Sequence, residues 1–475
     1  MVSSYRPGWA LVTAAVGYAI ALAALFPVQI AFPLLADAFH VSISSVSWAS
    51  TAFLLSLTVL ALLAGRIGDL YGHKRVFVTG LVVTTLGALL CGLAPSWPLL
   101  VALRFVQGVG AALVSGNAMA IAANAVPPEQ RGKAIGLLTT SASLGIVIAS
   151  WLAGRLVGVM SWHAVFLVVV PFGILALLTS FRMGPGFRPP PPPRLDLIGV
   201  VLLTLTLSAL VLSFSHFHEG PESFEAGWPY HSTMHTLTVF GLALFLFWER
   251  RTANPLVDLR VFRVAPFTLA VLANLCFHMT MMSTSFMYPY LVERGFGLTA
   301  AETANIVIGN NLAAMLAAVG TGALMDFLRS RVLQVFGIGL TFLSLLALAL
   351  LPSLSYSLVV LVGFSLGLAG GAFQTANNAF VLSSLPPNHR GFASGMIDLT
   401  RQYGHTLGIT VTTLVVAGAV EGAPSLTPVF QQAMFVTAGL ALVGCLLAFV
   451  ATRQRFSRLR EQETRVVECG IAPVA

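Results

Sequence analysis

The sequence predicts an all-α polytopic membrane protein made of two related helical bundles. Three observations support this prediction: the composition is too apolar for a soluble chain, long apolar runs recur along the whole length, and two motifs of the first half return in the second. Of the 475 residues, 57% are hydrophobic and 9% are charged, and the mean hydropathy is +0.88. Soluble proteins carry about 25% charged residues, so a soluble fold is excluded.

A helix needs roughly 20 mainly apolar residues to cross a bilayer. About fourteen runs of the chain approach this length, and the eighth is the shortest. The first run is too long for a signal peptide and has no small-residue cleavage site, so we expect it to remain as a span. The predicted spans are 9–33, 44–65, 75–93, 97–123, 134–157, 161–181, 195–216, 235–249, 265–292, 299–325, 332–351, 356–384, 391–419 and 428–452.

A polar stretch with three glycines separates the second and third runs: Gly65-Arg66-Ile67-Gly68-Asp69-Leu70-Tyr71-Gly72-His73-Lys74-Arg75. Glycine lets a neighbouring helix end approach closely, and Asp69 offers a negative charge to a helix N-terminus. The stretch therefore predicts a turn at the membrane surface.

Basic residues predict which surface this is. When alternate loops are assigned to the side of Lys74 and Arg75, twenty-one of the twenty-five Lys and Arg residues fall on that side. By the positive-inside rule this side is cytoplasmic, and an even number of spans places both termini there. The net charge of +8 thus reflects topology, and no nucleic-acid partner is expected. Of the four remaining basic residues, Arg155 and Arg294 lie in loops on the opposite side, and Arg104 and Arg401 lie within spans.

Two motifs recur across the middle of the chain. Gly65-x-x-x-Asp69 returns 257 residues later as Gly322-x-x-x-Asp326, and Pro127-Pro128-x-x-Arg131-Gly132 returns 259 residues later as Pro386-Pro387-x-x-Arg390-Gly391. Nearly equal offsets indicate two homologous six-helix halves. We therefore expect an N-terminal six-helix bundle at 1–182, a linker with two extra transmembrane helices at 183–264, a C-terminal six-helix bundle at 265–452 and a cytoplasmic tail at 453–475.

These motifs resemble those of the major facilitator superfamily, and the 6+2+6 plan resembles its fourteen-helix branch of drug:proton antiporters. The resemblance spans nearly the whole chain and implies a major facilitator fold and a secondary transporter that works by alternating access. It also implies a conformational latch formed by the 65–75 and 322–331 loops with Arg131. The residues of this latch are Gly65, Asp69, Gly72, Lys74, Arg75, Arg131 and Asp326.

Three charged residues inside spans are candidates for proton coupling. Arg104 lies in the fourth run and is costly in a membrane unless it faces water or a carboxylate, and it matches a family motif linked to proton coupling. Asp398 and Arg401 lie in the thirteenth run, with His405 one turn further on. Asp398 is the predicted proton carrier, tuned by Arg104. The alternative for Arg104 is a packing role in which backbone carbonyls hold the arginine. The alternative for Asp398 and Arg401 is a static ion pair.

Two departures from the branch put proton exchange in question. Ala24 stands where the branch usually has an acidic residue in the first helix, and Gln29 stands at its asparagine. In the fifth run, the usual Gly-Pro-x-x-Gly-Gly is replaced by Ala149-Ser150-Trp151-Leu152-Ala153-Gly154, which keeps one glycine.

Polar residues on the predicted spans, set among methionines and aromatics, suggest an apolar cavity with a few hydrogen-bonding groups. The alternative for each residue is interhelical hydrogen bonding or core packing. The candidate cavity residues are Gln29, Asn117, Asn274, His278, Tyr288, Asn310, Asn311 and Gln374.

Other chemistry is not indicated. The chain has no phosphate-binding Gly-x-x-x-x-Gly-Lys-Ser/Thr motif, so ATP is not the expected energy source. Its cysteines are scattered, and the histidines and carboxylates between residues 216 and 235 lack metal-site spacing, so no metal or cofactor is expected. We expect no enzyme activity.

The sequence thus favours a monomeric, proton-coupled exporter of lipophilic small molecules in the cell (inner) membrane, with protons and membrane lipids as its other partners. The missing first-helix acid leaves open a lipid or lysolipid transporter, or a facilitator without proton coupling. A third alternative is a receptor or scaffold that does not transport, which the absence of an appended soluble domain disfavours.

Overall fold

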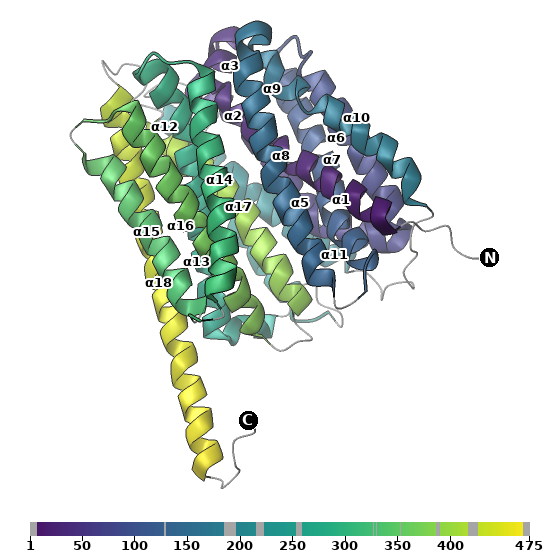
Figure 1. Cartoon of the computed structure of the whole chain (residues 1–475), viewed down its shortest axis with the longest axis vertical. Helices are drawn as coiled ribbons and strands as arrows, with labels where there is room; N and C mark the ends of the chain where they lie inside the picture. The colour runs from purple at the N-terminus through teal and green to yellow at the C-terminus, as the bar shows by residue number, and fades with distance from the viewer. Residues whose placement is uncertain are drawn as a thin grey trace.

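The computed structural model describes residues 7–127, 130–184, 196–214, 223–252, 259–325, 327–328, 330–351, 353–385, 390–416 and 426–468. Every regular element in these ranges is a helix, and a helix occupies each of the fourteen predicted runs (Figure 1). The predicted all-α architecture is confirmed.

Within the described ranges, nine helices are long and apolar enough to cross a membrane, and α5 (Trp48–Tyr71) is a tenth if its two bent parts are one span. One of the nine, Gly136–Met183, covers two predicted runs. The seventh, eighth and thirteenth runs form α11 (Leu197–Phe214), α12 (Ser223–Glu249) and α17 (Arg390–Val416). The chain is therefore a multi-pass membrane protein.

Prolines divide the first predicted span into three helices, a break that the sequence analysis did not anticipate. The segments are α1 (Pro7–Ala23), α2 (Phe26–Ile30) and α3 (Phe32–Phe39). Pro27 and Pro33 stand in the first turns of α2 and α3, where a missing backbone N–H costs nothing but a preceding helix cannot continue. The break frees the Ala24 carbonyl for a side-chain partner.

The rest of the first half is an antiparallel bundle. Its sixth predicted span is also interrupted, because Pro171 stands in the first turn of α10. The elements are α4 (Ile43–Val46), α5, α6 (His73–Cys91), α7 (Trp97–Asn124), α8 (Arg131–Met160), η2 (Ser161–His163), α9 (Ala164–Leu167), α10 (Val170–Ser180) and η3 (Phe181–Met183).

The second half begins with a short 3-10 segment, and its helices alternate in direction like those of the first half. Its first helix ends in a π-helical turn, η5, before the chain reverses. The elements are η4 (Leu259–Arg263), α13 (Ala265–Pro289), η5 (Tyr290–Gly295), α14 (Ala300–Leu324), α15 (Ser330–Leu350), α16 (Tyr356–Ser383), α17 and α18 (Leu426–Glu468). The helix α18 continues well past the predicted span end at 452 and projects below the bundle (Figure 1).

Equivalent glycines show how the two halves repeat one packing scheme. A Cβ atom added at Gly80 of α6 would lie 2.8 Å from the backbone nitrogen of Val114 on α7. A Cβ atom added at Gly337 of α15 would lie 2.5 Å from the backbone nitrogen of Phe373 on α16. The pairs are separated by the same 257 and 259 residues as the sequence motifs, so the repeat extends from the loops into the helix packing.

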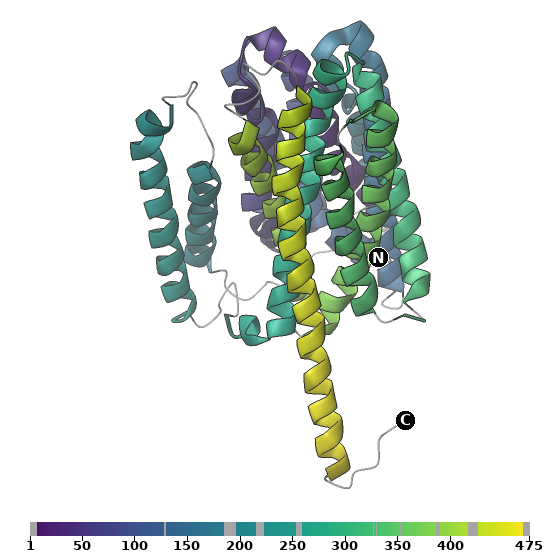
Figure 2. The same ribbon diagram turned by 90° about the vertical axis from the view of Figure 1, so that its left-hand side faces the viewer.

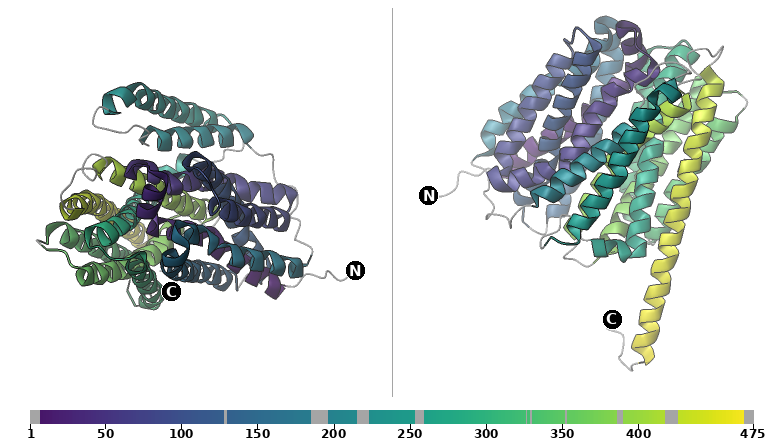
Figure 3. Two further views of the ribbon diagram at one scale, coloured as in Figure 1. Left: turned by 90° about the horizontal axis from the view of Figure 1, so that it is seen from above. Right: turned by 180° about the vertical axis from the view of Figure 1, so that it is seen from behind.

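The helices α11 and α12 form a pair beside the two bundles (Figures 2 and 3). The helix α11 packs against α5 and α17, one from each half, while α12 packs on α11. Val239 and Phe240 of α12 are 69% and 65% exposed, as expected for side chains that face lipid.

The two halves meet mainly through α8 with α14 and α5 with α17. In Figure 1, α8 and α14 approach each other at the top and separate toward the bottom. We call the lower end, where Lys74 and Arg75 lie, the basic end, and the upper end, where α3 ends and α14 begins, the opposite end. The halves are thus closed against each other at the opposite end.

Candidate functional site

The glycine-rich motif is mostly helical, which corrects the prediction of a turn spanning 65–75. The helix α5 continues through Gly65 and Asp69 to Tyr71, and the chain reverses at Gly72 before α6 begins at His73. Gly72 has φ +94°, a conformation that a side chain disfavours. One glycine therefore makes the turn.

Asn117 connects this motif to the neighbouring helix. A Cβ atom at Gly68 would lie 1.7 Å from its Oδ1 atom. The same Oδ1 atom lies 2.8 Å from His73 Nδ1, and Asn117 Nδ2 donates to the Ala64 carbonyl. His73 Nε2 lies 3.4 Å from an Asp69 oxygen. Asn117 is therefore part of the motif and not of a central cavity, which corrects its predicted place.

The remaining latch candidates are only partly described. Lys74 donates a hydrogen bond to the Gly184 carbonyl, which ties the motif to the end of the first half. Arg75 is exposed. The side chain of Arg131 and all of Asp326 lie outside the described part of the chain.

Arg104 is completely buried within the first half. Its Nε atom donates to the Ala49 carbonyl, and Nη1 donates to the Ala24 carbonyl at 3.1 Å and to Gln107 at 2.6 Å. Its guanidinium carbon lies 4.4 Å from the centre of the Phe53 ring. The arginine is therefore held by carbonyls and an aromatic face, the arrangement that the packing alternative describes.

Ala24 and Arg104 meet at the break between α1 and α2, where the branch usually supplies an acid. Arg104 Nη2 has no hydrogen-bond partner in the described structure. An arginine at the bilayer centre costs about 2.5–3.5 kcal/mol on insertion scales. The backbone carbonyls and the Gln107 amide offset part of this cost in place of a carboxylate.

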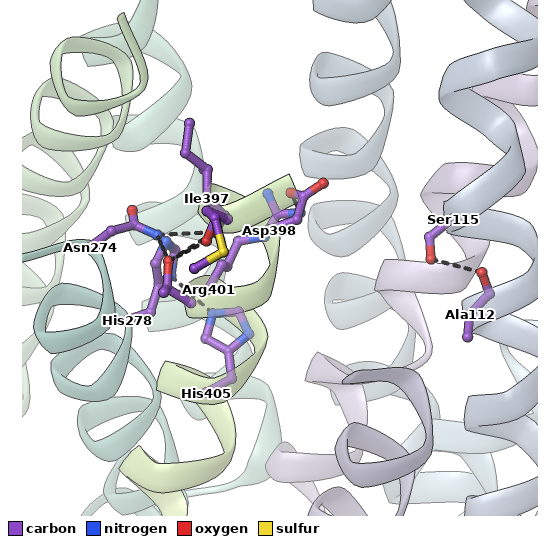
Figure 4. Close-up of polar contacts among 10 residues, drawn as sticks. Ala112, Ser115, Asn274, His278, Ile397, Asp398, Arg401 and His405 are labelled. Carbon is purple, nitrogen blue, oxygen red and sulfur yellow. Dashed lines mark hydrogen bonds and ion pairs between the residues drawn. The ribbon is translucent and has the colours of Figure 1, made fainter. Parts of the chain in front are cut away.

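A second charged group lies on α17 and faces the first half (Figure 4). Arg401 donates to Asp398 Oδ1 at 2.5 Å, and the two side chains are 23% and 44% exposed. Tyr18 on α1 lies next to Arg401. None of the described contacts joins this pair to Arg104, so the predicted tuning of Asp398 by Arg104 has no direct contact behind it.

Two histidines lie next to this pair. His278 Nδ1 on α13 is 3.1 Å from His405 Nε2 on α17, and Figure 4 shows both rings beside Arg401. His278 is 4% exposed. Phe26 of α2 meets His405 edge-on, with 6.4 Å between ring centres. The group therefore lies where the two halves touch.

A chain of amides fixes α13 behind these histidines. Asn274 Nδ2 donates to Thr400 at 2.9 Å and to the Ile397 carbonyl at 3.1 Å. Gln334 Nε2 donates to Asn377 Oδ1 at 2.7 Å, and Asn377 reaches Asn274 at 3.4 Å. These side-chain hydrogen bonds join α13, α15, α16 and α17, so Asn274 has a packing role.

Gln29 joins the halves directly. Ser285 of α13 donates to its Oε1 atom at 2.5 Å, and its Nε2 atom lies 2.9 Å from the Met282 sulfur. Gln29 is 2% exposed, so it closes the centre of the interface. Of the predicted cavity residues, Gln29 and His278 are the two whose contacts lie at this interface.

The four predicted cavity residues not yet described lie within the second half: Tyr288, Asn310, Asn311 and Gln374. Asn310 Nδ2 donates to the Gly363 carbonyl, which links α14 to α16, and Asn311 donates to Val307 within its own helix. The Tyr288 hydroxyl is buried and has no hydrogen-bond partner in the described structure. Gln374 is partly exposed on α16.

At the opposite end, an ion pair that sequence reasoning missed joins the halves. Arg294 of η5 bonds to Asp37 of α3. Both residues line an open cavity of about 800 Å³, together with Arg155 and Glu293. Arg155 and Arg294 were notable in the sequence as the basic residues opposite the main charge, which was a signal for a role at this end.

This arrangement of two repeated helical bundles that meet along α5, α8, α14 and α17 is the fold of a membrane transporter. The sequence profile described as Major Facilitator Superfamily matches residues 14–409, and it matches residues 270–468 as well. The chain belongs to the major facilitator superfamily.

Two relatives have names that refer to drug resistance or to export. The multidrug resistance protein Stp of Mycobacterium tuberculosis (strain CDC 1551 / Oshkosh) is 31% identical over 402 residues, which cover 82% of this chain and 72% of Stp. The cephamycin export protein CmcT of Amycolatopsis lactamdurans is 31% identical over 391 residues, which cover 80% of this chain and 79% of CmcT. The riboflavin transporter RibZ of Clostridioides difficile is 27% identical, over 80% of this chain and 82% of RibZ.

Solved transporters share the fold. A bacterial homologue of the human lysosomal transporter Spinster superposes with a TM-score of 0.68 at 16% identity, covering 94% of this chain and 97% of that one. A POT family transporter superposes with a TM-score of 0.72 at 15% identity, covering 94% and 96%.

Proposed function

We propose that this transporter exports lipophilic small molecules, is driven by protons and works by alternating access between its two halves. The observation that carries the proposal is the Asp398–Arg401 ion pair, because it lies on the thirteenth predicted span, where the halves meet. A proton on Asp398 would leave Arg401 without its counter-charge and so change the balance of this interface. The names of Stp and CmcT, which refer to multidrug resistance and to cephamycin export, support export as the direction.

The chemistry of the interface supports a lipophilic substrate. Met282 and Phe286 of α13 face α2 and α3, with the Phe286 ring 5.3 Å from that of Phe32. Gln29 and Ser285 add the few hydrogen-bonding groups. When the halves separate, these residues would line a largely apolar site with sparse polar contacts.

The domain organisation and membrane placement that we propose are those that the sequence predicts. We propose a monomer with six helices in each bundle, α11 and α12 as the extra pair, and bundle boundaries at 182 and 265. The basic end would face the cytoplasm in the cell membrane, with both termini on that side.

The motif at the basic end would act as the conformational latch. When this end closes, Asp69, held near His73 in the present arrangement, would hold a helix end and a nearby arginine, and Arg131 is the candidate arginine. Asp326 is the proposed counterpart of Asp69 in the loop of the second half.

A lipid transporter or facilitator without proton coupling is the second candidate. The observation that favours it is the absence of a carboxylate at Arg104, where Ala24 provides only a carbonyl.

Flux measurements in proteoliposomes separate the two candidates. We expect an imposed pH gradient to drive accumulation of rhodamine 6G by the wild type, and Asp398→Asn to reduce this accumulation at least tenfold. Asp196→Asn is the matched control, since Asp196 bonds to Trp248 in the extra helix pair. Gradient-independent movement of a fluorescent lysolipid, with no effect of Asp398→Asn, would support the lipid candidate and refute proton-driven export.

A further inference from the structure

The proposed function gives no role to the pair of histidines that lies beside the Asp398–Arg401 ion pair. His278 and His405 come from different helices of the second half, and their nitrogens lie 3.1 Å apart. This distance fits one hydrogen shared between two neutral imidazoles, with one ring donating and the other accepting. The partly exposed His405 keeps its Nδ1 atom shielded and without a hydrogen-bond partner in the described structure.

Exposure falls step by step along this face of α17. Asp398 is 44% exposed and Arg401 is 23% exposed at the side-chain level. His405 follows one turn further from the basic end, and it leads to the buried His278. Asp398, His405 and His278 are therefore a series of groups that can take up a proton, of which the first is partly exposed and the last is buried, while Arg401 keeps its charge.

Close packing holds the histidines in register. A Cβ atom at Gly404 would lie 2.6 Å from the His278 Cβ atom and 2.7 Å from the Leu275 carbonyl. The glycine thus lets α17 approach α13 closely enough for the two rings to meet. Phe26 from the first half covers the His405 ring edge-on, so separation of the halves would uncover this imidazole.

We propose that the His278–His405 pair is the interior proton-binding site of the transport cycle, and that the Asp398–Arg401 pair exchanges this proton with water at the basic end. This inference rests on the proton-driven export proposed above. In the described structure, Arg401 on α17 is the charged residue that faces the pair. Asp398 and Tyr18 adjoin Arg401, and Tyr403 lies on the neighbouring face toward α5. With Asp398 ionised and both imidazoles neutral, the group has no net charge.

One added proton gives the group a charge of +1 and converts the shared hydrogen into an imidazolium donor. In the arrangement seen here, that charge would lie beside the Arg401 guanidinium and behind Phe26, without a counter-charge. Protonation therefore belongs to the state in which the halves separate at the opposite end and water reaches His405 Nδ1. The proton then leaves through Asp398 when the basic end is open, which is the order that proton-driven export requires.

Binding measurements on the purified full-length protein test the proposal. If one proton and one rhodamine 6G molecule exclude each other, the apparent Kd of the wild type should fall about tenfold per pH unit as the pH rises toward the pKa of the dye-free site. Above that pKa it should level off, with the bend in the histidine range near pH 5–8. We expect His278→Gln and His405→Gln to reduce this dependence to less than about twofold per pH unit. His163→Gln is the matched control, because His163 lies at the opposite end against the Met160 carbonyl.

Measurements on Asp398→Asn show which proposal is wrong if only one of them is: the histidine site or proton-driven export. The variant should lose gradient-driven accumulation but keep the wild-type pH dependence of binding at equilibrium. Histidine variants that keep the full dependence would overturn the histidine site while leaving proton coupling intact. A wild type whose binding does not depend on pH would overturn both.

A spectroscopic measurement covers variants that fail to fold. In wild-type protein labelled with 15N-histidine, saturation with rhodamine 6G near pH 6 should change the imidazole signals of the His278–His405 pair from the singly protonated to the neutral form. Unchanged signals for both residues at saturating dye would overturn the proposal.

Discussion

Two arginines within the predicted spans, Arg104 and Arg401, have different kinds of hydrogen-bond partner. Arg104 is enclosed by carbonyls and by Phe53, and it makes no described contact with a carboxylate. Arg401 has a carboxylate partner, and both members of the pair are partly exposed. Arg104 is bonded to backbone carbonyls, so it cannot change partners unless the backbone around Ala24 rearranges. The side chains of Asp398 and Arg401 can separate without such a change. We therefore assign Arg104 to the architecture of the first half and Arg401 to the working interface.

Asp69 provides a test of the latch at the scale of one residue. Asp69→Asn keeps the side-chain shape and an acceptor for His73 but removes the charge. We expect transport of rhodamine 6G to fall at least fivefold, while the melting temperature stays within about 2 °C, because a partly exposed i,i+4 contact contributes about 0.3–0.5 kcal/mol. Wild-type transport by a well-expressed Asn variant would refute the latch.

At the scale of elements, the contact of α8 with α14 depends on a single glycine. Gly154 is the glycine that remains in the degenerate fifth-helix motif, and a Cβ atom there would lie 2.5 Å from the Ala304 Cβ atom and 3.2 Å from the Ala300 carbonyl. One turn further on, a Cβ atom at Gly158 would meet nothing within 4 Å. Gly154 is thus where α8 and α14 of the two halves touch.

Gly154→Val should therefore hold the opposite end apart, and Gly158→Val should not. The measurement is the labelling rate of a cysteine introduced at Ala300, in a background without the native cysteines. Ala300 is 7% exposed, so we expect slow labelling that rises at least fivefold with Gly154→Val. Equal rates in the two valine variants would show that α8 and α14 do not close this end.

At the scale of the whole molecule, closure of the opposite end combines apolar packing with the Asp37–Arg294 ion pair between the halves. The contact of Phe32 with Phe286 is buried and that of Gln29 with Ser285 is partly buried, whereas Asp37 and Arg294 remain 68% and 35% exposed at the side-chain level. Exposed pairs contribute only about 0.2–1 kcal/mol. The pair therefore adjusts an equilibrium between states that apolar packing dominates, and it does not lock the protein.

Charge exchange tests this assignment. Asp37→Asn should raise the Ala300→Cys labelling rate by about twofold to fivefold, the population shift that roughly 0.5–1 kcal/mol allows. Exchange of both charges, Asp37→Arg with Arg294→Asp, should restore the wild-type rate. If the double variant labels as fast as the single one, the pair does not contribute to closure.

The sequence by itself determined the membrane class, the helical architecture and the family. Long apolar runs have few other stable forms in lipid, because every backbone polar group must be satisfied within its own segment. Repeated motifs at offsets of 257 and 259 residues also predicted two related halves, and the packing of Gly80 and Gly337 repeats at the same spacing. Asp398 and Arg401 were paired correctly because three residues on a helix fix their distance.

Only the tertiary structure decided which polar residues meet across helices. Asn117 and Gln29 look alike in sequence as isolated amides in apolar runs, yet one bonds within the motif of the first half and the other bridges to the second. His278 and His405 are 127 residues apart, and Asp37 and Arg294 are 257 apart. Helical periodicity fixes neighbours within one helix, whereas the partner of a side chain across an interface depends on how whole helices pack, and no local pattern records that.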